Sequence, residues 1–167
     1  MMISREDIKK EAIITKNKHI SYEELFQFVE QYSCIFKDKG YKKVAIFSEN
    51  RVEWIYAFYA ALKNGSIVVP VDFAASNEDV AYILNDSQPE LIFSSHGQIK
   101  EIDKIKPKLN YSPEIIFFDD IQLPFVDPII EPITPSDIEN TAVIIYTSGT
   151  TGSPKGVMLS YKNLLAN

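Results

Sequence analysis

The sequence predicts an α/β fold in which helices flank a mainly parallel sheet. From about residue 21 onward, helix-like and strand-like segments alternate along the chain, which is the pattern of successive strand–helix–strand units. Hydrophobic residues make up 46% and charged residues 24% of the 167 residues, so the chain has the length and composition of one packed domain. No internal repeat or low-complexity segment interrupts this alternation.

The first helix is predicted to begin at Ser21. Ser21 and Glu24 have the spacing of a capping box, in which the two side chains accept hydrogen bonds from free N–H groups at the start of the helix. Gly40 is expected to end the segment in the left-handed conformation. Cys34 lies within this amphipathic segment and is expected to be a buried structural cysteine. Apolar residues recur at helical spacing at Leu25, Phe28, Val29, Tyr32 and Phe36.

The next segments predict a strand, a helix and a second strand. Residues 44–47 form a short apolar run that predicts a buried strand, and residues 49–50 break it. A helix is predicted over residues 52–63, because an Asn-Gly pair follows as a stop signal. Residues 67–70 predict a strand that ends at a proline and at Asp72. These three segments form one strand–helix–strand unit.

The same alternation continues toward residue 118. A helix is predicted over residues 78–84, because Ser76 and the asparagine that follows it are good N-cap residues. Residues 91–93 predict a strand, residues 99–105 a lysine-rich surface helix, and residues 115–118 a strongly apolar strand. The sheet therefore gains two further strands from this part of the chain.

The pattern changes between residues 119 and 140. Four prolines, at positions 124, 128, 132 and 135, remove backbone donors and favour extended backbone, so this segment is expected to be a connection rather than a helix. Its many apolar residues favour a connection inside one domain over a solvated linker. Residues 141–146 then predict a final buried strand.

Charge and cysteine usage exclude several classes of protein. The net charge of −6 disfavours nucleic acid as a partner, because binding to a phosphate backbone requires a basic face. A lone cysteine, with His19 and His96 as the only histidines, offers neither a disulfide nor a zinc-ligand spacing, so a cytoplasmic location is expected. No apolar run is long enough for a transmembrane segment, and the N-terminus does not have the pattern of a secretory signal.

The most informative segment is the sequence YTSGTTGSPKG at residues 146–156. A strand that ends in a loop of Gly, Ser and Thr presents backbone N–H groups and hydroxyls to an anion, and Lys155 adds a full positive charge. The glycines, including Gly156, are expected to allow close approach and positive φ angles. A P-loop is excluded, because Lys155 is preceded by Pro154 and followed by Gly156. The composition therefore predicts a polyphosphate site.

This segment, together with residues 157–160, resembles the glycine-rich signature of the AMP-forming adenylating enzymes, which include acyl-CoA synthetases, firefly luciferase and the adenylation domains of peptide synthetases. Residues 20–25 are similar to the opening helix segment of that family, and residues 62–72 to its second common motif. Residues 49–54 are similar to a Glu-Asn-Arg-Pro-Glu-Trp form found in fatty acyl-CoA synthetases, with Val52 in place of the proline. The resemblance covers essentially the whole chain.

The resemblance implies the N-terminal subdomain of the adenylate-forming enzyme fold and a reaction in two halves. A carboxylic acid, expected to be a fatty acid, would react with Mg-ATP to give an acyl adenylate and pyrophosphate, and CoA would then accept the acyl group. Lys155 would stabilise the pyrophosphate as it leaves. By the same resemblance, the residues that wrap the ATP phosphates would be Thr147, Ser148, Gly149, Thr150, Thr151 and Gly152.

The resemblance also indicates what residues 1–167 lack. In that family the adenine pocket, the magnesium-binding glutamate and the catalytic lysine follow the glycine-rich loop, so no catalytic residue and no metal ligand is expected in this chain. The chain is expected to be the N-terminal part of an AMP-binding domain, truncated in the helix that begins near Ser160, and to be inactive alone. Two alternatives remain, namely a fragment of an amino-acid adenylation domain and a freestanding binding module without catalytic activity.

Other polar residues are expected to have structural roles. Asp72 follows a strand, but the resemblance assigns it to a structural motif. Asp119 and Asp120 are expected in a solvated turn, because adjacent residues on extended backbone point in opposite directions. His19 and His96 are expected in loops.

Overall fold

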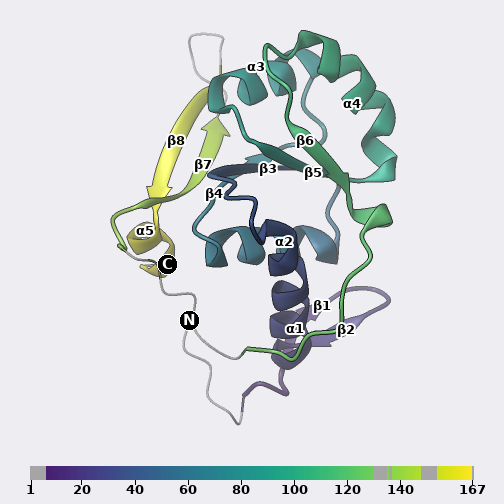
Figure 1. The fold of residues 1–167 in the computed structure, drawn as a ribbon, viewed down its shortest axis with the longest axis vertical. Helices are drawn as coiled ribbons and strands as arrows, with labels where there is room; N and C mark the ends of the chain where they lie inside the picture. The colour runs from purple at the N-terminus through teal and green to yellow at the C-terminus, as the bar shows by residue number, and fades with distance from the viewer. Residues whose placement is uncertain (1–6, 130–134, 136, 148–153, 167) are drawn as a thin grey trace.

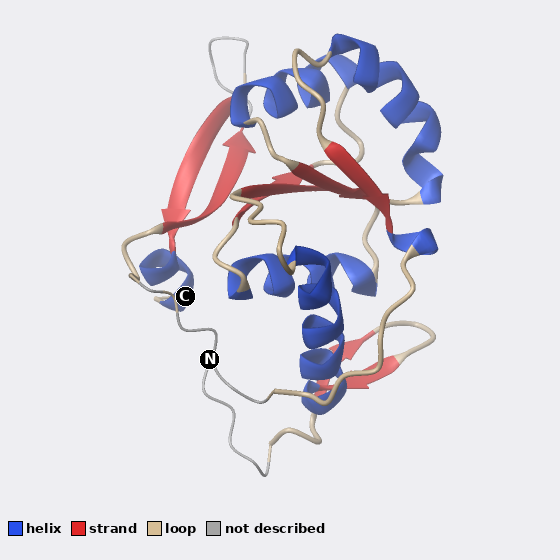
Figure 2. Ribbon diagram, viewed as in Figure 1, coloured by secondary structure: helices blue, strands red, loops and turns tan. Residues whose placement is uncertain are grey.

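The computed structural model describes residues 7–129, 135, 137–147 and 154–166. These residues form a six-stranded sheet in the order β6-β5-β3-β4-β7-β8, with helices on both faces, and a separate two-stranded hairpin (Figures 1 and 2). The strands of the large sheet are β3 (Lys43–Phe47), β4 (Ile67–Val71), β5 (Leu91–Ser94), β6 (Glu114–Phe117), β7 (Thr141–Thr147) and β8 (Lys155–Ser160).

The sheet is mainly parallel, which confirms the predicted fold class. Strand β3 pairs in parallel with β4 and β5, β5 with β6, and β4 with β7, whereas β8 runs antiparallel to β7. The centre of the sheet is fully buried, and Ala45 of β3 lies between Val69 of β4 and Ile92 of β5. Short, continuous apolar strands are typical of parallel sheets that are covered on both faces.

The helices cover both faces of the sheet. The helices are α1 (Tyr22–Ser33), α2 (Val52–Lys63), α3 (Asn77–Ser87), α4 (Ile99–Ile105) and α5 (Tyr161–Leu165). Val44 and Ile46 of β3 pack with α1 and α2, while the alternate residues Ala45 and Phe47 pack with α3 and α4. This alternation follows from the period of two of a strand, and it builds a separate hydrophobic core on each face. Figure 2 shows the helices on both sides of the sheet.

Aromatic side chains fill the core on the α1 and α2 face. The rings of Phe93 and Phe118 are stacked with centroids 5.5 Å apart, and Tyr32 lies against both at 6.3 Å. Phe28 of α1 stacks on Tyr56 of α2 at 4.5 Å. Such pairs add about 0.5–1.5 kcal/mol to the free energy gained by burying their area.

Several local predictions are confirmed. Helix α1 has the predicted capping box, in which the Ser21 side chain accepts from the N–H of Glu24 and the Glu24 carboxylate accepts from the N–H of Ser21. Helix α2 has the predicted bounds. Gly40 has a φ of +64°, in the left-handed region where a glycine carries no steric cost. Helix α1 ends earlier than predicted, at Ser33, and its last turn tightens into a 3₁₀ turn over Cys34–Phe36.

Other local predictions are wrong. Residues 141–146 are not the final buried strand, because β7 lies next to the edge strand β8 and Ile145 is 41% exposed. Cys34 is exposed rather than buried, since it faces away from the core at the end of α1. The hairpin of β1 (Glu11–Ile14) and β2 (His19–Ser21) was not predicted, because its strands are short. Its turn is closed by Thr15, whose hydroxyl accepts from the N–H groups of residues 17 and 18.

The proline-rich connection runs along helix α1. Gln31 Nε2 donates to the carbonyl of Pro124 at 2.9 Å, and Gln27 Nε2 donates to the carbonyl of Val126 at 3.4 Å. These side-chain donors satisfy two backbone carbonyls of the connection, which makes no sheet ladder of its own. Among the described residues, no helix is long and apolar enough to cross a membrane.

Candidate functional site

The predicted phosphate site lies at the turn between β7 and β8. Thr147 and Lys155 are the last paired residues of this hairpin, and Tyr146 and Gly156 form the pair before them. The structure therefore brings together the first and the last of the predicted site residues. The other predicted site residues lie outside the described part of the chain, and these are Ser148, Gly149, Thr150, Thr151 and Gly152.

The hairpin ends at the carboxyl edge of the parallel sheet. Because β7 is parallel to β4, and β4 to β3, the Thr147 end of β7 lies at the same edge as the carboxyl ends of these strands. In open α/β sheets, ligands bind outside the carboxyl ends of the strands. Helix α3 lies beside this end of the hairpin (Figure 1). The topology therefore places the predicted site at the edge where such folds bind ligands.

Lys155 carries a charge that no described acidic group neutralises. Its side chain is exposed and makes no ion pair with the residues that the structure describes. By contrast, Lys162 Nζ lies 2.7 Å from Glu139 Oε1, and Lys108 Nζ lies 2.5 Å from Glu78 Oε1. An exposed ammonium without a carboxylate partner is available to an anionic ligand.

Tyr146 anchors the hairpin to helix α3. Its hydroxyl donates a hydrogen bond to Asp86 Oδ2 at 2.5 Å. Burial and this hydrogen bond both raise the pKa of Tyr146 above its usual value, so the phenol keeps its proton at neutral pH. The donor in this hydrogen bond is therefore present under all ordinary conditions.

Gly156 packs closely against its neighbours in a way that the sequence did not indicate. The prediction of a positive φ at Gly156 is wrong, because this residue lies in strand β8 and is not among the described glycines with positive φ. A Cβ atom at this position would lie 3.0 Å from Ile144 Cγ2 and 3.1 Å from Tyr146 Cζ, so these side chains would have to shift by a few tenths of an ångström. Gly156 therefore leaves room for the Tyr146 ring, which is an effect of packing and not of backbone conformation.

A second polar cluster lies at the same carboxyl edge, beyond the ends of β3, β5 and β6. Arg51 Nη1 lies 3.1 Å from Asp119 Oδ2, and Arg51 Nε donates to Glu53 Oε2 at 2.9 Å. Asp119 also accepts from the N–H of His96 at 2.8 Å. As predicted, Asp119 lies with Asp120 in an exposed turn, the 3₁₀ turn over Phe118–Asp120. Asp119 also joins the segments that follow three strands, which the sequence did not indicate. Sequence reasoning missed Arg51, since no local pattern links it to Asp119.

The groups of this cluster satisfy one another. The N–H of His96 and the guanidinium of Arg51 lower the pKa of Asp119, and the Arg51 guanidinium carbon lies 5.3 Å from the centroid of the Phe118 ring. Ser95 Oγ donates to Glu49 Oε2 at 2.6 Å. Among the described residues, no group of three or more His, Cys, Asp or Glu side chains is placed to hold a metal ion. The cluster braces the edge of the sheet.

The remaining candidate residues have structural partners. Asp72 Oδ1 accepts from the N–H of Ala74 at 2.9 Å, which forms the turn after β4 and confirms the structural role predicted for Asp72. The prediction of a loop at His19 is wrong, because His19 is the first residue of β2, and its Nδ1 lies 2.5 Å from Glu11 Oε1 across the β1–β2 hairpin. His96 Nε2 lies 2.9 Å from Asp120 Oδ1. Each of these polar side chains is used by the fold itself.

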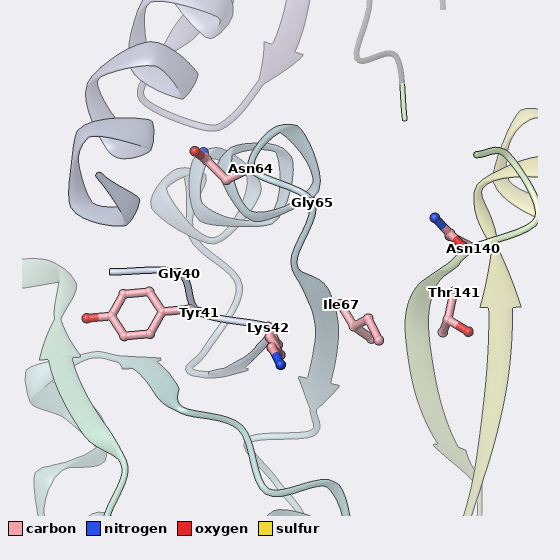
Figure 3. Close-up of a pocket in the computed structure, with 8 residues that line it drawn as sticks. All are labelled: Gly40, Tyr41, Lys42, Asn64, Gly65, Ile67, Asn140 and Thr141. Atoms are coloured by element: carbon pink, nitrogen blue, oxygen red, sulfur yellow. The ribbon is translucent and has the colours of Figure 1, made fainter. Parts of the chain in front are cut away.

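A hollow of about 440 Å³ lies at the amino ends of β3, β4 and β7 (Figure 3). It is lined by residues 40–42, 64–65, Ile67 and residues 140–141, which are mainly turn residues. This edge is opposite to the one that carries Thr147 and Lys155, because the strands are parallel. The hollow is therefore separate from the predicted phosphate site.

Comparison with known proteins gives a family match over nearly the whole chain. Residues 4–167 match the model of the family described as AMP-binding enzyme. Tyrocidine synthase 1 from Brevibacillus parabrevis is 33% identical over 158 residues, which cover 92% of this chain and 14% of that protein. Long chain acyl-CoA synthetase 8 from Arabidopsis thaliana is 29% identical over 172 residues, which cover 87% of this chain and 24% of that protein.

Solved structures show the same fold. ATP-bound MatB from Rhodopseudomonas palustris has a TM-score of 0.74 and 25% identity, over 98% of this chain and 34% of that chain. The anthranilate CoA ligase AuaEII in complex with anthranoyl-AMP has a TM-score of 0.80 and 22% identity, over 95% of this chain and 32% of that chain. The chain therefore spans about a third or less of the length of these relatives.

Proposed function

Since the chain belongs to the AMP-binding enzyme family of AMP-forming adenylating enzymes, we propose that residues 1–167 are the N-terminal part of the AMP-binding domain of an ATP-dependent acid–thiol ligase. The observation that carries this proposal is the hairpin at the carboxyl edge of the sheet. It holds Lys155, which has no ion-pair partner among the described residues, opposite Thr147. An anion-binding loop at such an edge is a common device for nucleotide phosphates.

The proposed reaction begins with the attack of a carboxylate on the α-phosphate of Mg-ATP, which breaks the bond to the β-phosphate. The products of this half are an acyl adenylate and pyrophosphate. The thiol of CoA then attacks the acyl carbon, so that a thioester forms and AMP leaves. Residues 147–152 hold the β- and γ-phosphates in this proposal, and Lys155 stabilises the charge that develops on pyrophosphate.

We propose a fatty acid as the carboxylate substrate and CoA as the thiol acceptor. The similarity of residues 49–54 to a motif of fatty acyl-CoA synthetases supports this choice, as does the acyl-CoA synthetase among the relatives. The second candidate is an amino-acid adenylation domain, which the identity to tyrocidine synthase 1 favours. The net charge of −6 and the lone cysteine accord with a cytoplasmic enzyme that does not bind nucleic acid.

The test is carboxylate-dependent exchange of pyrophosphate into ATP. The protein expressed from the open reading frame that encodes the chain should catalyse ATP–pyrophosphate exchange with medium- or long-chain fatty acids and not with the twenty amino acids. The reverse preference would select the second candidate. The 167-residue chain alone should give no exchange, because the proposal leaves the adenine pocket and the catalytic lysine outside residues 1–167. Exchange by the chain alone would contradict its assignment as a part of a domain. If the protein expressed from the open reading frame catalyses no ATP–pyrophosphate exchange with any acid, the result would favour a binding module.

A further inference from the structure

We propose that Asp86 is a positioning residue for the phosphate-binding hairpin and acts on Lys155 through Tyr146. The proposal rests on the proposed function, because it concerns the same site and names a residue outside the glycine-rich segment that prepares it. Asp86 lies 60 residues before Tyr146 in the sequence, and its Oδ2 accepts a hydrogen bond of 2.5 Å from the Tyr146 hydroxyl. No local pattern in the sequence connects the two.

The end of helix α3 that carries Asp86 is held in place by hydrogen bonds on both sides of it. Asn85 Nδ2 donates to the carbonyl of Lys108 at 2.9 Å, and Asn85 Oδ1 accepts from the N–H of Asn110 at 2.9 Å. Ser87 Oγ donates to the carbonyl of Ile83 at 2.6 Å, and the ammonium of Lys43 binds the carbonyl of Ser87. Asp86 therefore lies on a rigid element, as a positioning group requires.

The position of Tyr146 determines the position of both hairpin strands. Tyr146 is paired with Gly156, and the next pair is Thr147 with Lys155. The Tyr146 ring lies so close to Gly156 that a Cβ atom there would be 3.1 Å from Cζ and 3.3 Å from Oη. The ring thus contacts the opposite strand one residue from Lys155. Holding the phenol hydroxyl with Asp86 fixes the two backbones immediately before the phosphate-binding segment.

The charge of Asp86 allows a direct distinction between positioning and simple electrostatics. A carboxylate near an anion-binding loop repels the ligand, so removal of Asp86 would strengthen binding if charge alone mattered. A positioning role predicts the opposite sign, because the loss of the acceptor frees Tyr146 and the paired strands. Asn at position 86 keeps an acceptor oxygen for the phenol, so Asp86→Asn should retain most of the binding that Asp86→Ala loses.

The experiment is an NMR titration of the ¹⁵N-labelled 167-residue chain with inorganic pyrophosphate. Binding is monitored by the amide chemical shifts of Thr147, Lys155 and Gly156. We expect Asp86→Ala and Tyr146→Phe to weaken pyrophosphate binding by about three- to tenfold, as loss of one hydrogen bond predicts. Matched controls are Asp103→Ala, an exposed acid on α4, and Tyr82→Phe, an exposed tyrosine on α3, and both should bind as the wild type does.

Amide hydrogen exchange supplies a second measurement, which distinguishes a local effect on the hairpin from a general loss of stability. In Asp86→Ala, exchange should rise at the β8 amide that donates to β7, which is one of the neighbouring residues Lys155 and Gly156, because N–H groups of an antiparallel edge strand alternate between paired and solvent-facing. Exchange at Ala45 and Val69 of the central strands should stay the same. Equal acceleration at the β8 amide and at the central strands, or tighter pyrophosphate binding by Asp86→Ala, would overturn the positioning role. If the wild-type chain shows no shift with pyrophosphate, the proposed function of the hairpin fails in this chain, and the exchange pattern still decides whether Asp86 positions Lys155.

Discussion

Arg51 Nη1 lies 3.1 Å from Asp119 Oδ2, and this contact joins the segment that follows β3 to the segment that follows β6. The two side chains are only 21% and 32% exposed, so the pair is partly removed from water. Asp119 also accepts from the backbone N–H of His96, which follows β5. One carboxylate therefore ties together the carboxyl ends of three strands, although the residues involved are far apart in the sequence.

Replacement of Asp119 should destabilise the fold. Asp119→Asn removes the charge that pairs with Arg51 and leaves a partly buried guanidinium with fewer partners, so we expect a loss of about 1–3 kcal/mol in the free energy of unfolding. Urea denaturation of the 167-residue chain measures this value. The matched control is Asp120→Asn, because Asp120 is 61% exposed and its ion-pair partner among the described residues is His96 alone, and it should change stability by less than about 0.5 kcal/mol. Equal effects at both positions would contradict this account.

The same pair predicts how stability depends on pH. The pKa of Asp119 is lowered in the folded chain, first by the N–H of His96 and then by Arg51, relative to an unfolded value of about 3.9. A carboxyl with a depressed folded pKa adds stability above its unfolded pKa, and this stability is lost as the pH falls through the folded pKa. We therefore expect the urea midpoint to fall as the pH drops from about 4 toward the lower folded pKa of Asp119. The urea midpoint of Asp119→Asn should fall less steeply with decreasing pH than that of the wild type. An equally steep fall in both proteins would mean that other carboxyls cause the pH dependence.

Two serines of helix α1 should respond in opposite ways to the same substitution. Ser21 caps the helix, so Ser21→Ala should lose about 1 kcal/mol of stability. The hydroxyl of Ser33 is buried without a hydrogen-bond partner among the described residues. Ser33→Ala removes a desolvated polar group, so it should be neutral or stabilising. Thermal and urea unfolding of the two variants, compared side by side, check this contrast, and a larger loss at Ser33 would contradict it.

Tyr161 should contribute to stability through a single long-range hydrogen bond. Its hydroxyl donates to the carbonyl of Leu62 at 3.0 Å and joins helix α5 to the end of α2. Tyr161→Phe keeps the buried ring but removes one hydrogen bond to this carbonyl, which still accepts from the N–H of Gly65 at 3.1 Å, so we expect a loss of about 0.5–1.5 kcal/mol. Tyr59→Phe is the control, because Tyr59 is exposed. Equal urea midpoints for Tyr161→Phe and the wild type would show that the bond adds nothing.

The sequence was sufficient for the parts of the fold that depend on local patterns. Helix α2 has its predicted bounds because a run of apolar residues at helical spacing is followed by an Asn-Gly stop, and the α1 capping box lies within four residues of chain. Strands β3 and β5 were predicted because short apolar runs between polar breaks are typical of buried parallel strands. In each case the information lies within one short segment.

Long-range contacts were not predictable in this way. The Asp86–Tyr146 hydrogen bond joins residues that are 60 positions apart, and the Arg51–Asp119 pair joins residues that are 68 positions apart. Gly156 was assigned to backbone freedom, whereas its neighbour across the hairpin explains it better. Strand β8 was missed because its residues were read only as the continuation of a phosphate-binding motif. Such features depend on pairing between elements, which a local pattern does not specify.

Lys155 should be the most sensitive residue of the proposed site that the structure describes. In the proposed reaction its ammonium stabilises charge that develops on the leaving pyrophosphate, so Lys155→Ala should lower the rate of ATP–pyrophosphate exchange by about 10²–10³-fold. The measurement uses the protein expressed from the open reading frame that contains this chain. The effect should lie mainly in the rate at saturating ATP, because a group that acts on the leaving charge is more important in the transition state than in the ground state.

Lys162→Ala is the matched control for this prediction. Lys162 lies seven residues after Lys155, but its ammonium is bound to Glu139 and it belongs to the first turn of the short helix α5 rather than to the hairpin turn. We expect its exchange rate to stay within about twofold of the wild type, since exposed ion pairs contribute little. If both lysine variants lose activity equally, the loss reflects general charge near β8, and the specific role of Lys155 in stabilising pyrophosphate is wrong. A selective loss at Lys155 connects the ammonium at the end of the hairpin to the chemistry of the phosphate.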